Sequence, residues 1–494
     1  MKRRVWKLCL IGTGALAVLL PRPAAADYTA TATQAWDCQW KGWGCSLAWW
    51  ANAVTLTSYG DTYAGIVFGS GGTVTYNNQS VTLPGLELNV MRYNVGGGGP
   101  GNTLYNGTPW YKDIQGYWPG AWSSWDPTTS GWNWYADSAQ RNMMWKARDR
   151  GANILQFFSD SPMWWMTNSQ STNGAQTRGE NLNSTYYNWF CNYLAQVVKY
   201  ANANWGVSID SVEAFNEPSA YWWDIADGNS QEGCTFTAGS QASLLPTLRS
   251  ALNGAGQSGV RIAASDENDP GTATSTWNTF GTAGVQGDVG LVTTHSYSGQ
   301  QPYRDNTGRQ KLRTAIGSRE LWVTEYGDND GSGQALCTTI TEDVNYERPT
   351  VWCYWQPVEA STAWGFLNAD YSTGATTWVY TKHYVFANFT NYIRPGMYIF
   401  KSSDTNTIFA YDNSAGKLVI LTVNYGTAQN VTYDLSALSS IGSSYDMIQT
   451  KFDGSALLAH YGPWNLSSSQ IAQRKFTAWY PANCVSVLRI NATQ

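Results

Sequence analysis

Short apolar runs alternate with longer amphipathic stretches over most of the chain. The runs have the length and composition of strands buried on both faces. They are Trp43–Leu47, Leu88–Asn94, Ile154–Ser159, Val212–Asn216, Arg261–Ser265, Leu291–Tyr297, Leu321–Glu325 and Val351–Gln356. Between them, apolar residues spaced three and four apart predict helices, among them Asn142–Arg150, Tyr186–Asn204, Leu244–Leu252 and Trp378–Asn391.

Eight strands with helices between them predict an α/β fold, a (β/α)8 TIM barrel over residues 42–392. A doubly wound open sheet is the alternative. The glycine run Gly96–Gly99 follows a strand, but it lacks the spacing of a phosphate-binding loop.

A different pattern begins after Pro395, where apolar and polar residues alternate with the two-residue period of half-buried strands. The expected strands are Tyr398–Phe400, Thr407–Tyr411, Lys417–Val423, Val431–Leu435 and Cys484–Ile490. They predict a β-sandwich over residues 393–494, to which the Thr-rich segment 27–41 adds a strand from the other chain end. No Pro- or Ser-rich linker intervenes, so we expect the sandwich to pack firmly against the barrel.

The first 26 residues have the composition of a secretory signal peptide. Basic residues in Met1–Arg4 precede an apolar stretch from Val5 to Leu20, and Ala24–Ala26 offers a small-residue cleavage site. The apolar stretch is short for a membrane span, and no later segment has eighteen consecutive apolar residues. The sequence therefore predicts a secreted, extracellular protein that does not cross a membrane.

Charge and aromatic content narrow the class of partner. Residues 1–26 carry five of the 30 basic residues and none of the 35 acidic ones, so the remaining chain has a net charge of −10. That charge argues against nucleic acid, which requires a positive surface. The 27 tryptophans and 30 tyrosines exceed what a core requires, and such rings suit sugar faces or protein interfaces. We expect a monomer.

Seven cysteines follow residue 26, and export favours disulfides. They are Cys38, Cys45, Cys191, Cys234, Cys337, Cys353 and Cys484. The odd number leaves at least one thiol free or bonded outside the chain, and the pairing stays open. With no CxxC pair and three scattered histidines, the sequence predicts no metal site and no cofactor.

Two glutamates carry the candidate chemistry. Glu217 and Glu325 each follow an apolar run at its carboxyl end, where a carboxylate is costly to desolvate and is kept mainly for a function. Their separation of 108 residues fits strands four and seven of a barrel. Such a pair suits the acid and the nucleophile of a glycoside hydrolase. The alternative is two ordinary surface glutamates.

Neighbouring polar residues fit the same chemistry. Asn216 is placed to bind a sugar 2-hydroxyl beside the acid, and Tyr297 is a candidate to orient the nucleophile. Arg92 lies on a buried strand and needs a carboxylate, which either glutamate could supply. His295 is a candidate donor, although a lone histidine on a strand is more often a core residue.

Tryptophans follow several of the expected strands. A single tryptophan is usually a core residue, but aromatic residues at one strand end after another suggest platforms for sugar rings. The candidates are Trp50, Trp165, Trp222 and Trp355.

These motifs resemble those of glycoside hydrolase family 30, in clan A of the retaining glycosidases. The resemblance rests on Gly42-Trp-Gly44 with Trp49-Trp50, Arg92–Gly97, Ser161–Trp165, Asn216-Glu-Pro218 and Thr324-Glu325. Within the family, Gly42–Trp50, Asn216–Trp223 and Gln231–Cys234 look most like the endo-β-1,6-galactanases. The resemblance implies that Glu217 is the acid/base, that Glu325 is the nucleophile, and that the substrate is the β-1,6-galactan of arabinogalactan side chains.

One departure bears on the substrate. The glucuronoxylan-cleaving branch of the family binds an acidic sugar through basic residues near strand eight, whereas this chain has no Lys or Arg between Gln356 and Thr381. We therefore expect a neutral substrate. A β-1,6-glucanase is the nearest alternative, and a non-catalytic carbohydrate-binding protein is an alternative from another class.

Overall fold

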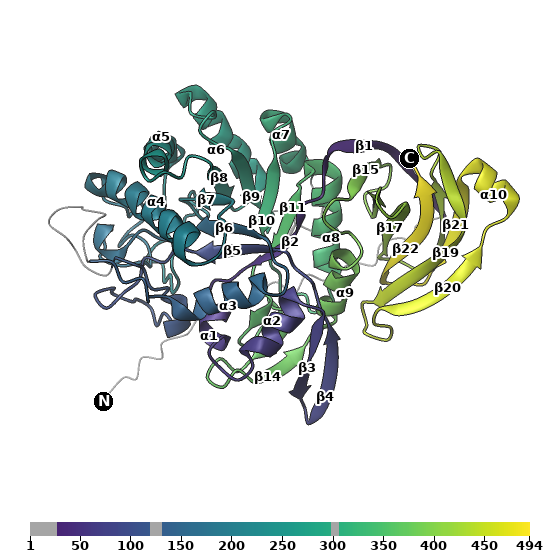
Figure 1. The fold of residues 1–494 in the computed structure, drawn as a ribbon, viewed down its shortest axis with the longest axis horizontal. Helices are drawn as coiled ribbons and strands as arrows, with labels where there is room; N and C mark the ends of the chain where they lie inside the picture. Colours follow the sequence, from purple (N-terminus) through teal and green to yellow (C-terminus); the bar gives the residue numbers. More distant parts are fainter. Residues whose placement is uncertain (1–26, 119–130, 298–305) are drawn as a thin grey trace, which may run out of the picture.

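The computed structural model describes residues 27–118, 131–297 and 306–494, except for the side chains of residues 35–38. Its centre is a closed barrel of eight parallel strands (Figure 1). In chain order these are β2 (Gly42–Ser46), β5 (Val90–Asn94), β6 (Ile154–Phe158), β7 (Ser211–Glu213), β8 (Arg261–Glu267), β9 (Leu291–His295), β10 (Leu321–Glu325) and β11 (Val351–Tyr354). Every expected barrel strand is present, so the TIM barrel is confirmed and the open sheet is wrong.

Helices cover the outside of the barrel (Figure 1). They are α1 (Trp50–Val54), α2 (Gly60–Phe68), α3 (Ser138–Arg148), α4 (Tyr187–Asn204), α5 (Ala238–Gly254), α6 (Pro270–Ala283), α7 (Thr307–Ile316), α8 (Gln334–Glu342) and α9 (Thr381–Thr390). The helix expected at Trp378–Asn391 is shorter than predicted, because residues Thr376–Val379 form strand β14 against β13 (Leu367–Ala369). The β-branched residues of that segment favour a strand.

The sandwich contains more strands than the pattern indicated. Its elements are β15 (Tyr398–Ser402), β16 (Thr407–Asp412), β17 (Lys417–Asn424), β18 (Gln429–Asp434), β19 (Ser440–Lys451), β20 (Ala459–Asn465), α10 (Ser468–Gln473), β21 (Lys475–Tyr480) and β22 (Cys484–Thr493). Strand β1 (Tyr28–Gln39) pairs antiparallel with β15 and parallel with β18. The sandwich is therefore built from both chain ends, as expected (Figure 1).

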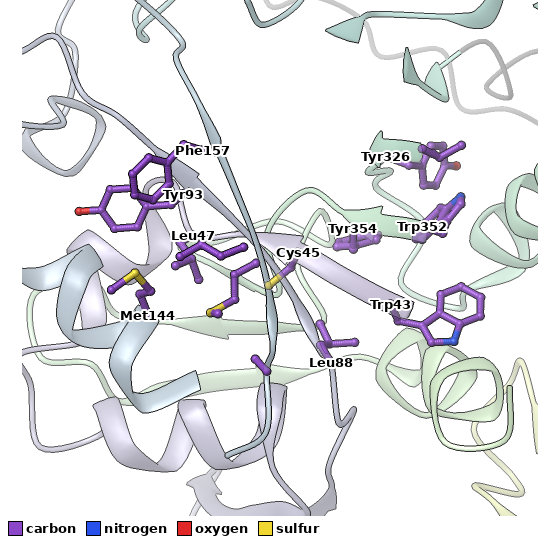
Figure 2. Packing of buried hydrophobic residues seen from close by; sticks show 14 of the residues in the cluster. Trp43, Cys45, Leu47, Leu88, Tyr93, Met144, Phe157, Tyr326, Trp352 and Tyr354 are labelled. Carbon is purple, nitrogen blue, oxygen red and sulfur yellow. The ribbon is translucent and has the colours of Figure 1, made fainter. Parts of the chain in front are cut away.

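The barrel and the sandwich share one hydrophobic core. Phe389 and Ile393 at the end of α9 belong to the same buried cluster as Leu421 and Val487 of the sandwich. The amide of Asn388 donates a 2.7 Å hydrogen bond to Thr450 Oγ1 across this contact. Figure 2 shows the barrel part of the cluster, with Trp43, Trp352 and Tyr354 lying on one side of it. A shared core fixes the orientation of the two parts.

The barrel interior is apolar at one level and polar at the next. Side chains such as Val90, Leu291 and Trp322 form a separate buried cluster inside the barrel. Higher along the strands, Arg92 Nε donates to Gln156 Oε1 at 3.0 Å, and Thr293 donates to Glu213 Oε1 at 2.7 Å. This polar layer supports the groups at the carboxyl ends of the strands.

Within the described residues, no disulfide involves Cys45, Cys191, Cys234, Cys353 or Cys484. Cys45 and Cys353 lie on the adjacent strands β2 and β11, but they belong to different buried clusters, outside and inside the barrel. Burial raises the pKa of the Cys353 thiol to about 12. Buried thiols of this kind are inert core residues. The side chain of Cys38 lies outside the described part.

No helix in the described ranges combines the length and apolar character that a membrane crossing requires. The expected signal peptide, residues 1–26, lies outside the described residues.

Candidate active site

A cleft of about 580 Å³ opens at the carboxyl ends of the barrel strands. Side chains at the end of β10 and in the turns after β7, β9 and β11 reach it, because parallel strands end at the same rim of a barrel. Four of the predicted site residues other than the glutamates line it: Asn216, Trp222, Tyr297 and Trp355. Both Glu217 and Glu325 are also in its wall, so the structure brings the two candidate carboxylates together.

The two glutamates are close and nearly buried. A carboxylate oxygen of Glu217 lies within 4.8 Å of one from Glu325, and the side chains belong to residues only 7% and 5% exposed. Glu325 is the last residue of β10, whereas Glu217 follows β7 after a short turn. Glu217 has a φ of 45°, a left-handed conformation that residues with a side chain seldom adopt. Hydrogen bonds of 2.9 Å, from its amide to Asp266 O and from Trp223 Nε1 to its carbonyl, hold this turn.

Glu325 is held by donors on both oxygens. Arg92 Nη1 donates to Oε2 at 2.9 Å, and the Tyr297 hydroxyl donates to Oε1 at 2.9 Å. Burial raises the pKa of Glu325, and the positive charges of His295 and Arg92 oppose that rise. Donors to both oxygens stabilise the ionised form, which a nucleophile requires.

Arg92 itself is fully buried and does not line the cleft. Its second terminal nitrogen, Nη2, donates to Asp266 Oδ2 at 2.5 Å, and its guanidinium lies 4.2 Å from the centre of the Phe158 ring. The carboxylates of Asp266 and Glu325 both meet the expectation that buried Arg92 needs an acidic partner. Its assignment as a substrate-binding residue is wrong, because it is enclosed beneath the carboxylates.

His295 lies between the carboxylates. Its Nδ1 is 3.2 Å from Glu217 Oε1 and 3.7 Å from Glu325 Oε1, and its Nε2 is 3.2 Å from Asp266 Oδ2. Burial alone lowers the pKa of His295, but Glu325 and Asp266 raise it well above its usual value. The carboxylates around the ring therefore favour its protonated, imidazolium form, and Nδ1 lies within hydrogen-bond distance of Glu217 Oε1. It reaches the glutamates from below and is absent from the cleft wall.

Glu217 has one donor that the sequence did not identify. Asn268 is the residue that follows β8, and its Nδ2 donates a 2.6 Å hydrogen bond to Glu217 Oε1. The expected strand ends at Ser265, whereas β8 extends to Glu267, so only the observed strand places Asn268 directly at its carboxyl end. Asn216 lines the cleft beside Glu217, and its Oδ1 is buried and accepts no hydrogen bond from the described residues.

The cluster of Glu217, His295 and Glu325 also has the spacing of a metal site, with one atom from each within 4.8 Å. Protein donors already occupy these oxygens. Arg92 and Tyr297 donate to the two oxygens of Glu325, and Asn268 donates to Glu217 Oε1. The arrangement fits proton transfer and nucleophilic attack.

The tryptophans divide between cleft and core. Trp355 and Trp222 line the cleft, as does Trp49, whose ring meets Trp355 edge to face with centroids 4.8 Å apart. Trp50 and Trp165 are wrong predictions. Trp50 is completely buried and donates to Ser46 O at 2.7 Å, and Trp165 is 2% exposed and donates to Trp118 O at 3.0 Å.

In the Trp49-Trp50 pair the backbone conformation decides which ring faces the cleft. Trp49 has a left-handed φ of 68°, so it and Trp50 point in different directions. Periodicity does not encode such a turn.

The charge argument for a neutral substrate also needs correction. The strand-eight turn has no basic residue, but Lys112 of the short helix Trp110–Lys112 reaches the same cleft. Its ammonium lies 4.1 Å from the centre of the Trp49 ring. Glu359 lines the cleft as well, and its charge acts on Lys112. A cation is present, but an acidic neighbour offsets it.

Comparison with known proteins agrees with the barrel fold and identifies the class of the protein as a glycoside hydrolase. Residues 31–346 match the model of "O-Glycosyl hydrolase family 30". The chain is 38% identical over 442 residues to an endo-β-1,6-galactanase of Hypocrea rufa, covering 86% of this chain and 87% of the relative. The chain therefore belongs to glycoside hydrolase family 30.

Two further matches are more distant. An exo-β-1,6-galactobiohydrolase of Bifidobacterium longum subsp. longum is 24% identical over 438 residues, covering 71% of this chain but 28% of that protein. The catalytic domain of a family 30 xylanase C from Talaromyces cellulolyticus superposes with a TM-score of 0.69 at 20% identity, covering 94% of this chain and 99% of that one. At that identity the second match supports the fold alone.

The imidazolium of His295 generates a pH prediction. His295→Asn removes a positive charge that stabilises ionised Glu325, so the pKa of Glu325 rises. Since Glu325 must be ionised to attack, the acid limb of kcat/KM should move to higher pH by about one unit. A pH–rate profile measures this, with His460→Asn, on the exposed strand β20, as the control. An acid limb that stays in place or moves to lower pH would contradict the assigned charge state.

Proposed function

We propose that this glycoside hydrolase is a secreted, retaining endo-β-1,6-galactanase that acts on the galactan side chains of arabinogalactan. The observation that carries the mechanism is the pair of glutamates, whose oxygens lie within 4.8 Å across the cleft. Retaining glycosidases hold their carboxyl groups about 5 to 5.5 Å apart, whereas inverting ones leave about 6.5 to 9.5 Å for a water molecule.

The surroundings of the two glutamates support different roles. Glu325 is fixed by Arg92 and Tyr297, so its carboxylate attacks the anomeric carbon and forms the glycosyl-enzyme. Glu217 protonates the leaving oxygen and then, as a base, takes a proton from the incoming water. The side chain of Asn216, which lines the cleft next to Glu217, binds the sugar 2-hydroxyl, a contact that strengthens in the transition state.

The rings of the cleft support sugar binding. Trp355, only 8% exposed, presents its surface beside Glu325 and is braced by Trp49. Trp222 lies on the side of Glu217 and provides a surface for the departing part of the chain. Apolar sugar faces stack on such rings.

Two observations support β-1,6-galactan as the substrate. The relative from Hypocrea rufa, similar over 86% of the chain, is an endo-β-1,6-galactanase. The cleft is lined by the acidic side chains of Asp160, Glu232 and Glu359, and Lys112 is the one cation among its described lining residues. Such a surface favours a neutral substrate rich in hydroxyl donors over an acidic one. A β-1,6-glucanase remains the alternative within the family.

Substitution of each glutamate separates their roles. Glu325→Gln should abolish hydrolysis of natural and aryl substrates alike, because no nucleophile remains. Glu217→Gln should retain much of the first step with aryl glycosides whose leaving group needs no proton. With Glu217→Ala, azide should restore turnover and give a β-glycosyl azide. Near wild-type activity of Glu325→Gln would overturn the assignment.

Initial rates on three polysaccharides test the substrate. At equal reducing-end concentration, β-1,6-galactan should be cleaved faster than β-1,6-glucan, and glucuronoxylan should be cleaved least. Removing arabinose from arabinogalactan should raise the rate, since substituents block the ring faces that stack on tryptophan. A preference for β-1,6-glucan would favour the alternative and leave the two-glutamate mechanism intact. A preference for glucuronoxylan would contradict the charge argument.

A further inference from the structure

Two buried carboxyl groups in the cleft have no part in the mechanism above. Asp160 follows β6, and Glu232 belongs to the loop between β7 and α5. Both line the cleft, although the residues are only 3% and 2% exposed. The side-chain amide of Asn94, at the end of β5, joins them by donating to Asp160 Oδ2 at 2.8 Å and to Glu232 Oε2 at 2.9 Å.

This arrangement is costly to maintain. Burial raises the pKa of Asp160 and of Glu232 well above the usual range, and the charge of Asp160 adds to the effect on Glu232. Within the described ranges, neither group forms an ion pair with a Lys or Arg. A fold that only needed to fill this space could use apolar residues, which cost less to bury. The carboxyls are therefore candidates for binding a ligand.

The order of the strands places Asp160 relative to a bound sugar. Strands β5, β6 and β7 are neighbours in the barrel, so Asn94, Asp160 and Asn216 follow one another around the rim. Asp160 lines the same cleft as Glu217 and Glu325, so it lies beside the reaction centre. With the anomeric carbon at Glu325 and the 2-hydroxyl at Asn216, the ring continues through C3 and C4 toward β6.

We propose that Asp160 binds the C4 hydroxyl of the sugar at the cleavage position and thereby selects galactose. This assignment rests on the proposed galactanase function and identifies the residue that distinguishes galactose from glucose, which differ in the direction of that hydroxyl. Glu232 is a positioning residue, because it fixes Asn94, which in turn orients Asp160. Its other oxygen accepts the amide of Ile114 at 3.2 Å.

The physical basis of the selection is the cost of an unmatched buried acceptor. A sugar whose C4 hydroxyl points elsewhere fills the cleft, excludes water and leaves Asp160 with only its bond from Asn94, so that its other oxygen has no donor. A site built to bind a hydroxyl rejects an analogue that lacks it far more strongly than an apolar pocket does.

The test combines a change in the enzyme with the removal of one hydroxyl. The parent substrate is nitrophenyl β-1,6-galactobioside, and its analogue lacks the C4 hydroxyl on the galactose that carries the nitrophenyl group. For the wild type, removing the hydroxyl should lower kcat/KM about 100-fold. Asp160→Asn should lower kcat/KM for the parent by about the same factor, but for the analogue by less than about threefold, because the interaction is already missing.

Control variants separate this role from a general effect on the cleft. Glu359→Gln changes a carboxyl on the strand-eight side of the same cleft. It should change kcat/KM for both substrates by the same factor. Glu232→Gln leaves Asp160 in place. It should lower kcat/KM for the parent substrate by about tenfold and kcat/KM for the analogue by a smaller factor. If Asp160→Asn does not fold, Glu232→Gln and the comparison of the two substrates with the wild-type enzyme still decide the test.

The outcomes distinguish the two proposals. If the wild type does not hydrolyse the parent substrate, the galactanase function fails. If the wild type hydrolyses parent and analogue equally well, the galactanase function stands and Asp160 does not bind the C4 hydroxyl. The same conclusion follows if Asp160→Asn lowers kcat/KM for both substrates by the same factor.

Discussion

The buried guanidinium of Arg92 is the interaction on which the rest of the site depends. It lies at the centre of a group of carboxyls, paired with Asp266 at 2.5 Å and with Glu325 at 2.9 Å. Without a cation there, ionised Glu325 would face buried Asp266 and Glu217 with His295 as the one remaining positive neighbour among the described residues. Removing one partner of a buried pair costs on the order of 3 to 5 kcal/mol. The same pairing that keeps the nucleophile charged therefore also holds β5, β8 and β10 together at the rim.

Much of the fold was predictable because buried parallel strands are encoded as continuous apolar runs. A carboxylate that ends such a run stands out, and this feature of the sequence identifies Glu217 and Glu325. The strands of the sandwich were harder to recognise. β20 (Ala459–Asn465) is mostly exposed and β19 (Ser440–Lys451) contains a register shift, so neither shows a clean two-residue period.

The errors at the site have a common cause, since side-chain direction in turns is not encoded by periodicity. Trp49 rather than Trp50 faces the cleft because of one left-handed residue, and Lys112 enters from a loop far along the chain from strand eight. The need of Arg92 for a carboxylate follows from its place on a buried strand, but only the three-dimensional arrangement shows it beneath the glutamates. Export favours disulfides, but in the described part of the chain Cys45 and Cys353 are buried thiols on opposite sides of the barrel wall.

The central claim is that the two carboxylates act by double displacement, and the stereochemistry of the first product tests it most directly. Proton NMR during the first minutes of hydrolysis of nitrophenyl β-1,6-galactobioside reports the anomer before mutarotation. Two inversions at the anomeric carbon should release the sugar with the β configuration. An initial α-anomer signal would make the enzyme inverting and would contradict the assignment of Glu325 as the nucleophile.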